Sequence, residues 1–117
     1  MEEDIEMTEC IVLIRRFVKP ERASEYEAWV ARQPAVTAEG FIGKTLTRVD
    51  AHAELPAGLN GFHLAGNPGC ATFVMVERWA SLAHFKAYVP RASTADQDEF
   101  ELWPRQRAVL TVCGAPD

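Results

Sequence analysis

Glu77 and Trp79 are the residues of this sequence whose types and spacing are best suited to chemistry. They lie two positions apart in the stretch FVMVERWASLAHFKAYV, which has the pattern of a strand up to residue 79 and of a helix after it. Side chains two apart in a strand point to the same face, so we expect both to face the helices together with Met75. A carboxylate in that position can act as a general base, and an indole can stack on a planar aromatic ligand.

Each of the two residues also has a purely structural explanation. Trp79 can be a core residue that covers the start of the following helix. Glu77 can instead be ion-paired with Arg15 or Arg16 of the first predicted strand. Because these two arginines are adjacent, their side chains must point to opposite faces, and we expect one under the helices and the other in an interface.

The remaining candidates for proton transfer are two histidines in the long connection between residues 50 and 69. Imidazole is suited to proton transfer near neutral pH, so His52 and His63 are alternative bases to Glu77. The three histidines and three cysteines of the chain match no ligand spacing of a metal site, so we expect no metal.

The elements that must position these residues follow from the periodicity of the apolar residues. Four segments are typical of strands: residues 10–18, 40–49, 70–79 and 107–113. Two segments have apolar residues at helical spacing: residues 20–34 and 81–89. The order β-α-β-β-α-β predicts an α+β, ferredoxin-like fold with both helices on one sheet face. Leu59, Phe62 and Leu64 of the long connection are expected to fold over a pocket.

Length and composition are those of a single globular domain. The chain has 117 residues, of which we interpret 1–9 as an acidic N-terminal tail and 10–117 as the domain. The net charge of −5 argues against a nucleic-acid partner. The sequence shows neither a signal peptide nor an apolar run long enough to cross a membrane. Three cysteines without a CxxC spacing favour reduced thiols and a cytoplasmic protein.

The sheet face away from the helices is expected to be apolar as well. The residues assigned to it are Val12, Ile14, Val74 and Val76. An exposed apolar face of that size favours a homodimer in which a second copy covers it. Trp103, an aromatic residue in a polar segment next to Pro104, is a candidate dimer contact.

The sequence resembles the antibiotic biosynthesis monooxygenase (ABM) family of the dimeric α+β barrel superfamily. The resemblance is carried by VLIRRFVKPERASEYEAW, EGFIGKTLTRVD and FVMVERWASLAHFKAYV, which cover most of residues 10–90. Its most specific part is the Glu-x-Trp-x-Ser motif formed by Glu77, Trp79 and Ser81. The resemblance implies a dimer with a pocket between each sheet and its own helices.

Within that family, many members oxidise aromatic polyketide-type substrates without metal or flavin, others degrade heme, and others have no known activity. Trp79 matches the pocket tryptophan of the cofactor-free oxygenases, whereas Phe85, Met75 and Thr47 stand where those enzymes have tyrosine, asparagine and histidine. The heme-degrading branch requires an asparagine on the first strand and a histidine after the second helix. This sequence has neither, so we expect no heme.

The resemblance therefore implies a small cofactor-independent, monooxygenase-like enzyme that uses O₂ to oxidise a planar aromatic or polyketide-type intermediate. Such chemistry needs a base, from among Glu77, His52 and His63, and a positive charge near the oxyanion, from Arg15 or Arg16. The substrate slot would be formed by Trp79, Phe85, Tyr88, Trp29, Tyr26 and Met75. Two alternatives are a cyclase or isomerase that needs no O₂, and a ligand-binding protein without catalysis.

Overall fold

The computed structural model describes residues 8–50, 53–62, 64, 69–92 and 99–113 of the 117-residue chain. Its elements in chain order are β1 (Cys10–Val18), η1 (Pro20–Arg22), α2 (Ala23–Arg32), β2 (Phe41–Arg48), β3 (Ala71–Trp79), α3 (Leu82–Tyr88), η2 (Val89–Arg91) and β4 (Glu101–Thr111). This order confirms the predicted ferredoxin-like α+β fold. Residues 1–7 of the predicted acidic tail lie outside the described residues.

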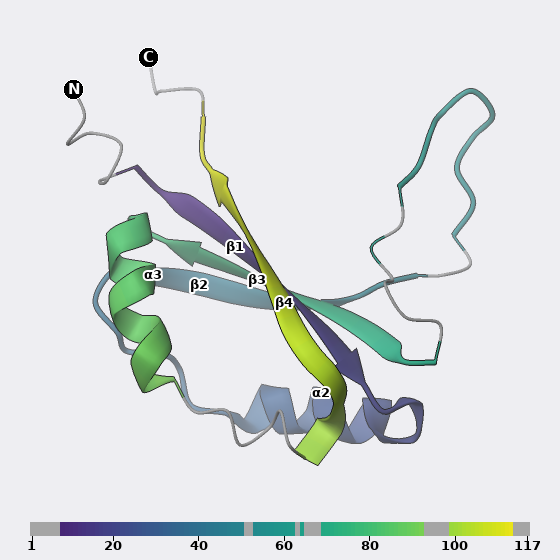
Figure 1. Ribbon diagram of the computed structural model, residues 1–117, viewed down its shortest axis with the longest axis horizontal. Helices are drawn as coiled ribbons and strands as arrows, with labels where there is room; N and C mark the ends of the chain where they lie inside the picture. Colours follow the sequence, from purple (N-terminus) through teal and green to yellow (C-terminus); the bar gives the residue numbers. More distant parts are fainter. Residues whose placement is uncertain (1–7, 51–52, 63, 65–68, 93–98, 114–117) are drawn as a thin grey trace.

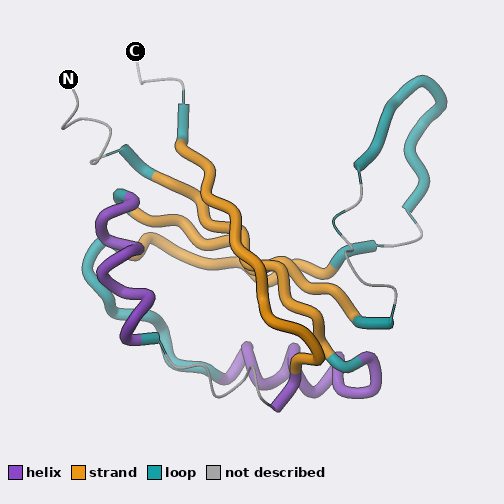
Figure 2. The backbone as a smooth tube through the Cα atoms, viewed as in Figure 1, coloured by secondary structure: helices purple, strands orange, loops and turns teal. Residues whose placement is uncertain are grey.

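The four strands form one antiparallel sheet in the order β2-β3-β1-β4. Both helices lie on the same side of it, as Figures 1 and 2 show. In the register of this sheet, Glu77 lies opposite Val12 of β1 and Lys44 of β2. Met75, Glu77 and Trp79 face the helices, as predicted from their alternation in the strand.

The register corrects the predicted composition of the two sheet faces. Val12 and Ile14 pair with Glu77 and Met75, so they lie on the helix side and belong to the core. Only the β3 half of that prediction, Val74 and Val76, lies on the opposite face. That face carries Ile11, Leu13, Val74, Val76 and Leu110. The prediction was wrong because alternation is known within each strand, whereas the phase between two strands depends on their pairing.

Two buried clusters lie between the sheet and the helices. Trp79 is fully buried in the cluster beneath α3, and its ring centroid lies 5.2 Å from that of Phe41 and 5.9 Å from that of Phe85. Tyr26 of α2 is fully buried in the second cluster, where its ring packs against Phe73 and Phe100. Each helix therefore covers its own end of the sheet.

The start of β2 is held closely against the start of α3. Ser81 caps α3, since its Oγ accepts a hydrogen bond from the backbone nitrogen of His84 at 3.2 Å. Gly40, just before β2, has a φ of +83°, and a Cβ there would lie 2.3 Å from Cγ of His84. Only glycine fits this backbone conformation and this contact without strain.

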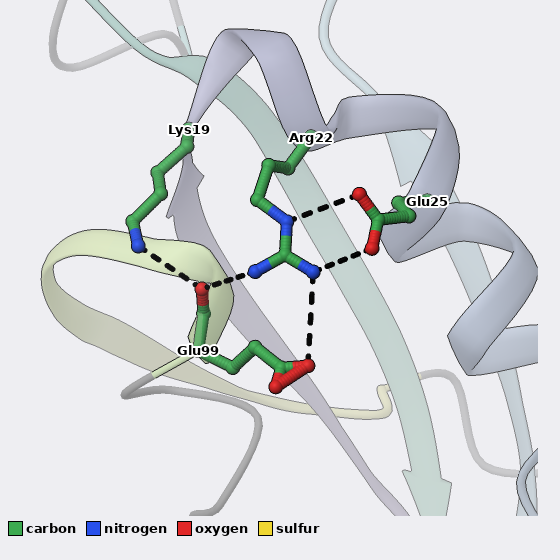
Figure 3. A network of polar contacts seen from close by, with 4 residues as sticks. All are labelled: Lys19, Arg22, Glu25 and Glu99. Carbon is green, nitrogen blue, oxygen red and sulfur yellow. Dashed lines mark hydrogen bonds and ion pairs between the residues drawn. The ribbon is translucent and has the colours of Figure 1, made fainter.

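The entry to α2 is tied to the segment that precedes β4 (Figure 3). Lys19 Nζ and Arg22 both donate to the backbone carbonyl of Glu99, at 3.1 and 3.0 Å. Arg22 also donates through Nε to Glu25 at 3.1 Å, and this hydrogen bond lowers the pKa of Glu25. The network connects the segment that follows β1 with the segment that precedes β4, and its exposed ion pairs contribute little energy.

Strand β4 begins at Glu101 rather than at the predicted residue 107. The prediction stopped short because the segment contains Pro104, which cannot donate to a strand ladder. β4 is the edge of the sheet and pairs only with β1 among the described strands, so a proline there is tolerated. Irregularities in the β1–β4 pairing occur around Phe17, close to Trp103.

The described part of the long connection between β2 and β3 does not cover the helix-side pocket, contrary to the prediction. Its described part, residues 53–62, projects away from the helices in Figure 1, and all of its side chains are exposed. The side chain of Phe62 is 84% exposed, and Leu59 and Leu64 are exposed as well. Leu64 accepts a hydrogen bond from Arg15 through its carbonyl, on the sheet face that has no helices. At Leu64 the connection therefore approaches the opposite side of the sheet.

Candidate functional site

A cavity of about 710 Å³ lies between the sheet and its two helices. Ile14 and Met75 of the central strands contribute the apolar part of its lining on the sheet side. Aromatic side chains from both helices face it, namely Trp29 of α2 with Phe85 and Tyr88 of α3. Residues 33–39, the connection from α2 to β2, complete the wall. Such a cavity has the size and the mixed lining of a small-molecule site.

The described lining of this cavity is rich in positive charge. It contains five cationic side chains, Arg16, Lys44, Arg91, Arg105 and Arg107, and two carboxylates, Glu39 and Glu77. The chain as a whole carries a net charge of −5. The cavity therefore has the opposite sign of charge from the protein that contains it, which favours anionic ligands.

Glu77 is the buried carboxylate of the cavity, with 9% of its surface exposed. The indole Nε1 of Trp79 donates to its Oε1 at 3.1 Å, so the two residues singled out in the sequence are in direct contact. This hydrogen bond fixes the orientation of the carboxylate. Arg15 is not its ion-pair partner, because Arg15 points to the opposite face, where its Nε donates to Gln106 at 3.1 Å.

Arg16 is the arginine that lies under the helices, as predicted for one of the two neighbours. It is 8% exposed and lines the cavity. One terminal guanidinium nitrogen donates to the hydroxyl of Tyr26 at 2.7 Å. Tyr26 itself is fully buried and does not line the cavity, so it holds Arg16 in position from behind.

Strand β4 contributes two more arginines to the same region. The guanidinium of Arg105 forms a buried ion pair with Glu101, with 6% and 0% of the two side chains exposed. Arg107 is more exposed, and partial burial of its guanidinium lowers its pKa. The neighbouring charges of Arg105 and Arg16 act in the same direction, whereas Glu77 and Glu101 oppose it. Arg107 therefore lies close to other cationic side chains, those of Arg105 and Arg16.

The structure brings six of the predicted site residues together around the cavity: Glu77, Met75, Phe85, Tyr88, Trp29 and Arg16. Trp79 and Tyr26 lie directly behind its wall, each bonded to a residue that lines it. Arg15 and Thr47 face away from it, and Thr47 donates to the carbonyl of Val74 at 2.7 Å. His52 and His63 lie outside the described residues.

Sequence reasoning missed the cationic residues that strands β2 and β4 contribute, Lys44, Arg105 and Arg107. A signal for two of them was present, since Arg105 and Arg107 are two positions apart and must share a face in a strand. It was not used because the strand was expected to begin only at residue 107. Lys44 could be placed only once β2 was known to pair with β3.

Other kinds of site find less support in the part of the chain that the structure describes. No group of three His, Cys, Asp or Glu side chains is arranged there to hold a metal ion. Among the described helices, none has the length and apolarity needed to cross a membrane. Cys10, Cys70 and Cys113 are free thiols, and burial raises the pKa of Cys10.

Comparison of the sequence with protein-family models and with curated proteins finds no match. Solved structures do resemble the fold. A protein of unknown function from Nitrosomonas europaea matches with a TM-score of 0.62 at 15% identity, over 95% of this chain and 95% of that chain. A proposed antibiotic biosynthesis monooxygenase from Bacillus cereus matches with a TM-score of 0.56 at 17% identity, over 94% of this chain and 98% of that chain.

These similarities extend over nearly the whole length of all three chains. The protein has the ferredoxin-like α+β fold of these two structures. At this level of identity the similarity establishes the shared fold alone, because one fold can carry many different functions.

Proposed function

We propose that this protein is a small, cofactor-independent, monooxygenase-like enzyme of the ABM type. Its substrate is a planar aromatic or polyketide-type intermediate of a biosynthetic pathway, and O₂ is the co-substrate. The observation that carries the proposal is the buried carboxylate of Glu77 in a cavity walled by aromatic side chains. A general base, an aromatic slot and nearby positive charge are the three requirements of this chemistry.

In the proposed reaction, Glu77 removes a proton from the hydroxylated ring system, and the resulting anion is electron-rich. Trp29, Phe85 and Tyr88 form the slot for the rings. The guanidinium of Arg16, which is held in position by its hydrogen bond to Tyr26, stabilises the oxyanion. The substrate anion then reduces O₂ directly. A ring methylene becomes a carbonyl, one oxygen atom enters the product, and the other leaves as water.

The test of this proposal is O₂ uptake with a hydroxylated anthrone in metal-free buffer. We expect one O₂ to be consumed per anthrone, at a rate well above that of the protein-free control. Anaerobic turnover of the anthrone would instead favour a cyclase or isomerase, for which the same Glu77 carboxylate suffices as an acid–base group. Binding of the anthrone without formation of a product, in air and under anaerobic conditions alike, would indicate a binding protein and would contradict the proposal that the protein is an enzyme.

We also propose that the protein is a cytoplasmic homodimer. The sheet face opposite the helices supports the dimer, because Leu110 is exposed there and Ile11, Leu13 and Val76 are only partly buried in the single chain. Trp103, 52% exposed on β4, remains a candidate contact. Sedimentation at micromolar concentration is expected to give the mass of two chains, and a single 13.0 kDa species would contradict the dimer.

A further inference from the structure

Among the three arginines that the strands contribute to the cavity, Arg107 differs from Arg16 and Arg105. Arg105 is neutralised by its buried ion pair with Glu101, and Arg16 donates to Tyr26. Arg107 lines the same cavity but forms no hydrogen bond or ion pair with any other residue that the structure describes. A guanidinium presents a planar array of donors that matches a carboxylate in two parallel hydrogen bonds.

The sheet register sets the distance between Arg107 and the proposed base. Arg107 lies opposite Ile14, and Ile14 lies opposite Met75, so Arg107 and Met75 are two strands apart, about 10 Å. Glu77 is two residues further along β3, which adds about 7 Å along the strand direction. Both side chains rise from the helix-side face, with apolar Ile14 and Met75 between them. A fused ring system with one anionic end fits this arrangement.

We propose that Arg107 binds a carboxylate group of the substrate, so that the natural substrates are planar aromatic acids rather than neutral aromatic compounds. This inference deepens the proposed function and rests on it for the identity of the ring system. The carboxylate at Arg107 fixes the substrate lengthwise in the slot. The reacting end is thereby presented to Glu77, on the other side of Ile14 and Met75.

The test compares two ligands of nearly the same shape, naphthoate and the neutral naphthamide, by calorimetric titration of the protein. We expect naphthoate to bind about tenfold more tightly, since a charge-assisted hydrogen-bonded pair contributes more than a neutral one. Arg107→Gln should remove this preference and leave the affinity for naphthamide unchanged. Arg107→Lys, which keeps the charge and loses the planar fork, should retain only part of it.

Arg48→Gln serves as the matched control. Arg48 is a half-exposed arginine of β2 that pairs with Glu27 and does not line the cavity, so its removal should leave the naphthoate preference intact. The preference should also decrease with added salt, because Arg107 is accessible to solvent. Equal affinity for the two ligands, no binding of either, or a preference that survives in Arg107→Gln would overturn the proposal.

This result is separate from the test of the enzyme itself. A naphthoate preference that depends on Arg107, without O₂ uptake on the anthrone, would contradict the oxygenase and leave the carboxylate site intact. O₂ uptake on the anthrone without any naphthoate preference would support the oxygenase and overturn the carboxylate site at Arg107.

Discussion

Replacing Trp79 with alanine is expected to lower the free energy of unfolding by about 3–5 kcal/mol, the range for removing a large aromatic side chain from a core. Its side chain is fully buried and packs against the rings of Phe41, Phe85 and Tyr88. The loss is large compared with the roughly 5–15 kcal/mol that stabilises an ordinary domain. Urea denaturation followed by far-UV circular dichroism measures it.

Two further variants separate packing from simple loss of an aromatic ring. Trp79→Phe keeps an aromatic ring in the cluster and loses the hydrogen bond to Glu77, so we expect a smaller destabilisation than in the alanine variant. Phe62→Ala removes an aromatic ring that is 84% exposed and should change the stability by less than about 0.5 kcal/mol. If Trp79→Ala were as stable as Phe62→Ala, the indole would not be part of the core.

Replacing Glu77 with glutamine is expected to reduce kcat on the anthrone by about 10²–10⁴-fold, the usual contribution of a general base. The amide has nearly the same shape, and its oxygen can still accept the hydrogen bond from Trp79, so the cavity should keep its form. Affinity for the aromatic ligand should therefore change little. Steady-state kinetics and calorimetric binding on the same preparation separate the two effects.

Glu27→Gln is the corresponding control for the loss of a carboxylate. Glu27 lies on α2, is half exposed, and is paired with Arg48 outside the cavity, so its replacement should leave kcat unchanged. If Glu77→Gln retained the full kcat, the base would have to be another group, and His52 and His63 would be the next residues to replace.

The local features of the fold were predictable because they depend on neighbouring residues. The period-two alternation of Met75, Glu77 and Trp79 placed all three on the helix side, and the structure confirms this. The first strand was predicted at its observed bounds, residues 10–18. The side chains of the adjacent Arg15 and Arg16 were predicted to point to opposite faces of the sheet, and the structure confirms this.

Features that depend on distant residues were not predictable in the same way. Strand β4 was predicted too short because Pro104 is unfavourable in a strand unless that strand is at an edge, and the edge position is known only from the assembled sheet. The loop residues Leu59 and Phe62 are apolar enough to suggest a cover for the pocket. The described loop nevertheless projects away from the helices.

The sequence by itself determined the order of the elements. It also determined which side chains of a strand share a face, because alternation and helical spacing are local properties of the chain. Only the tertiary structure decided that Glu77, Arg16 and Arg107 line one cavity, since these residues come from three different strands. Their relative positions depend on the pairing register, and shifting a strand by a single residue would turn its side chains to the other face.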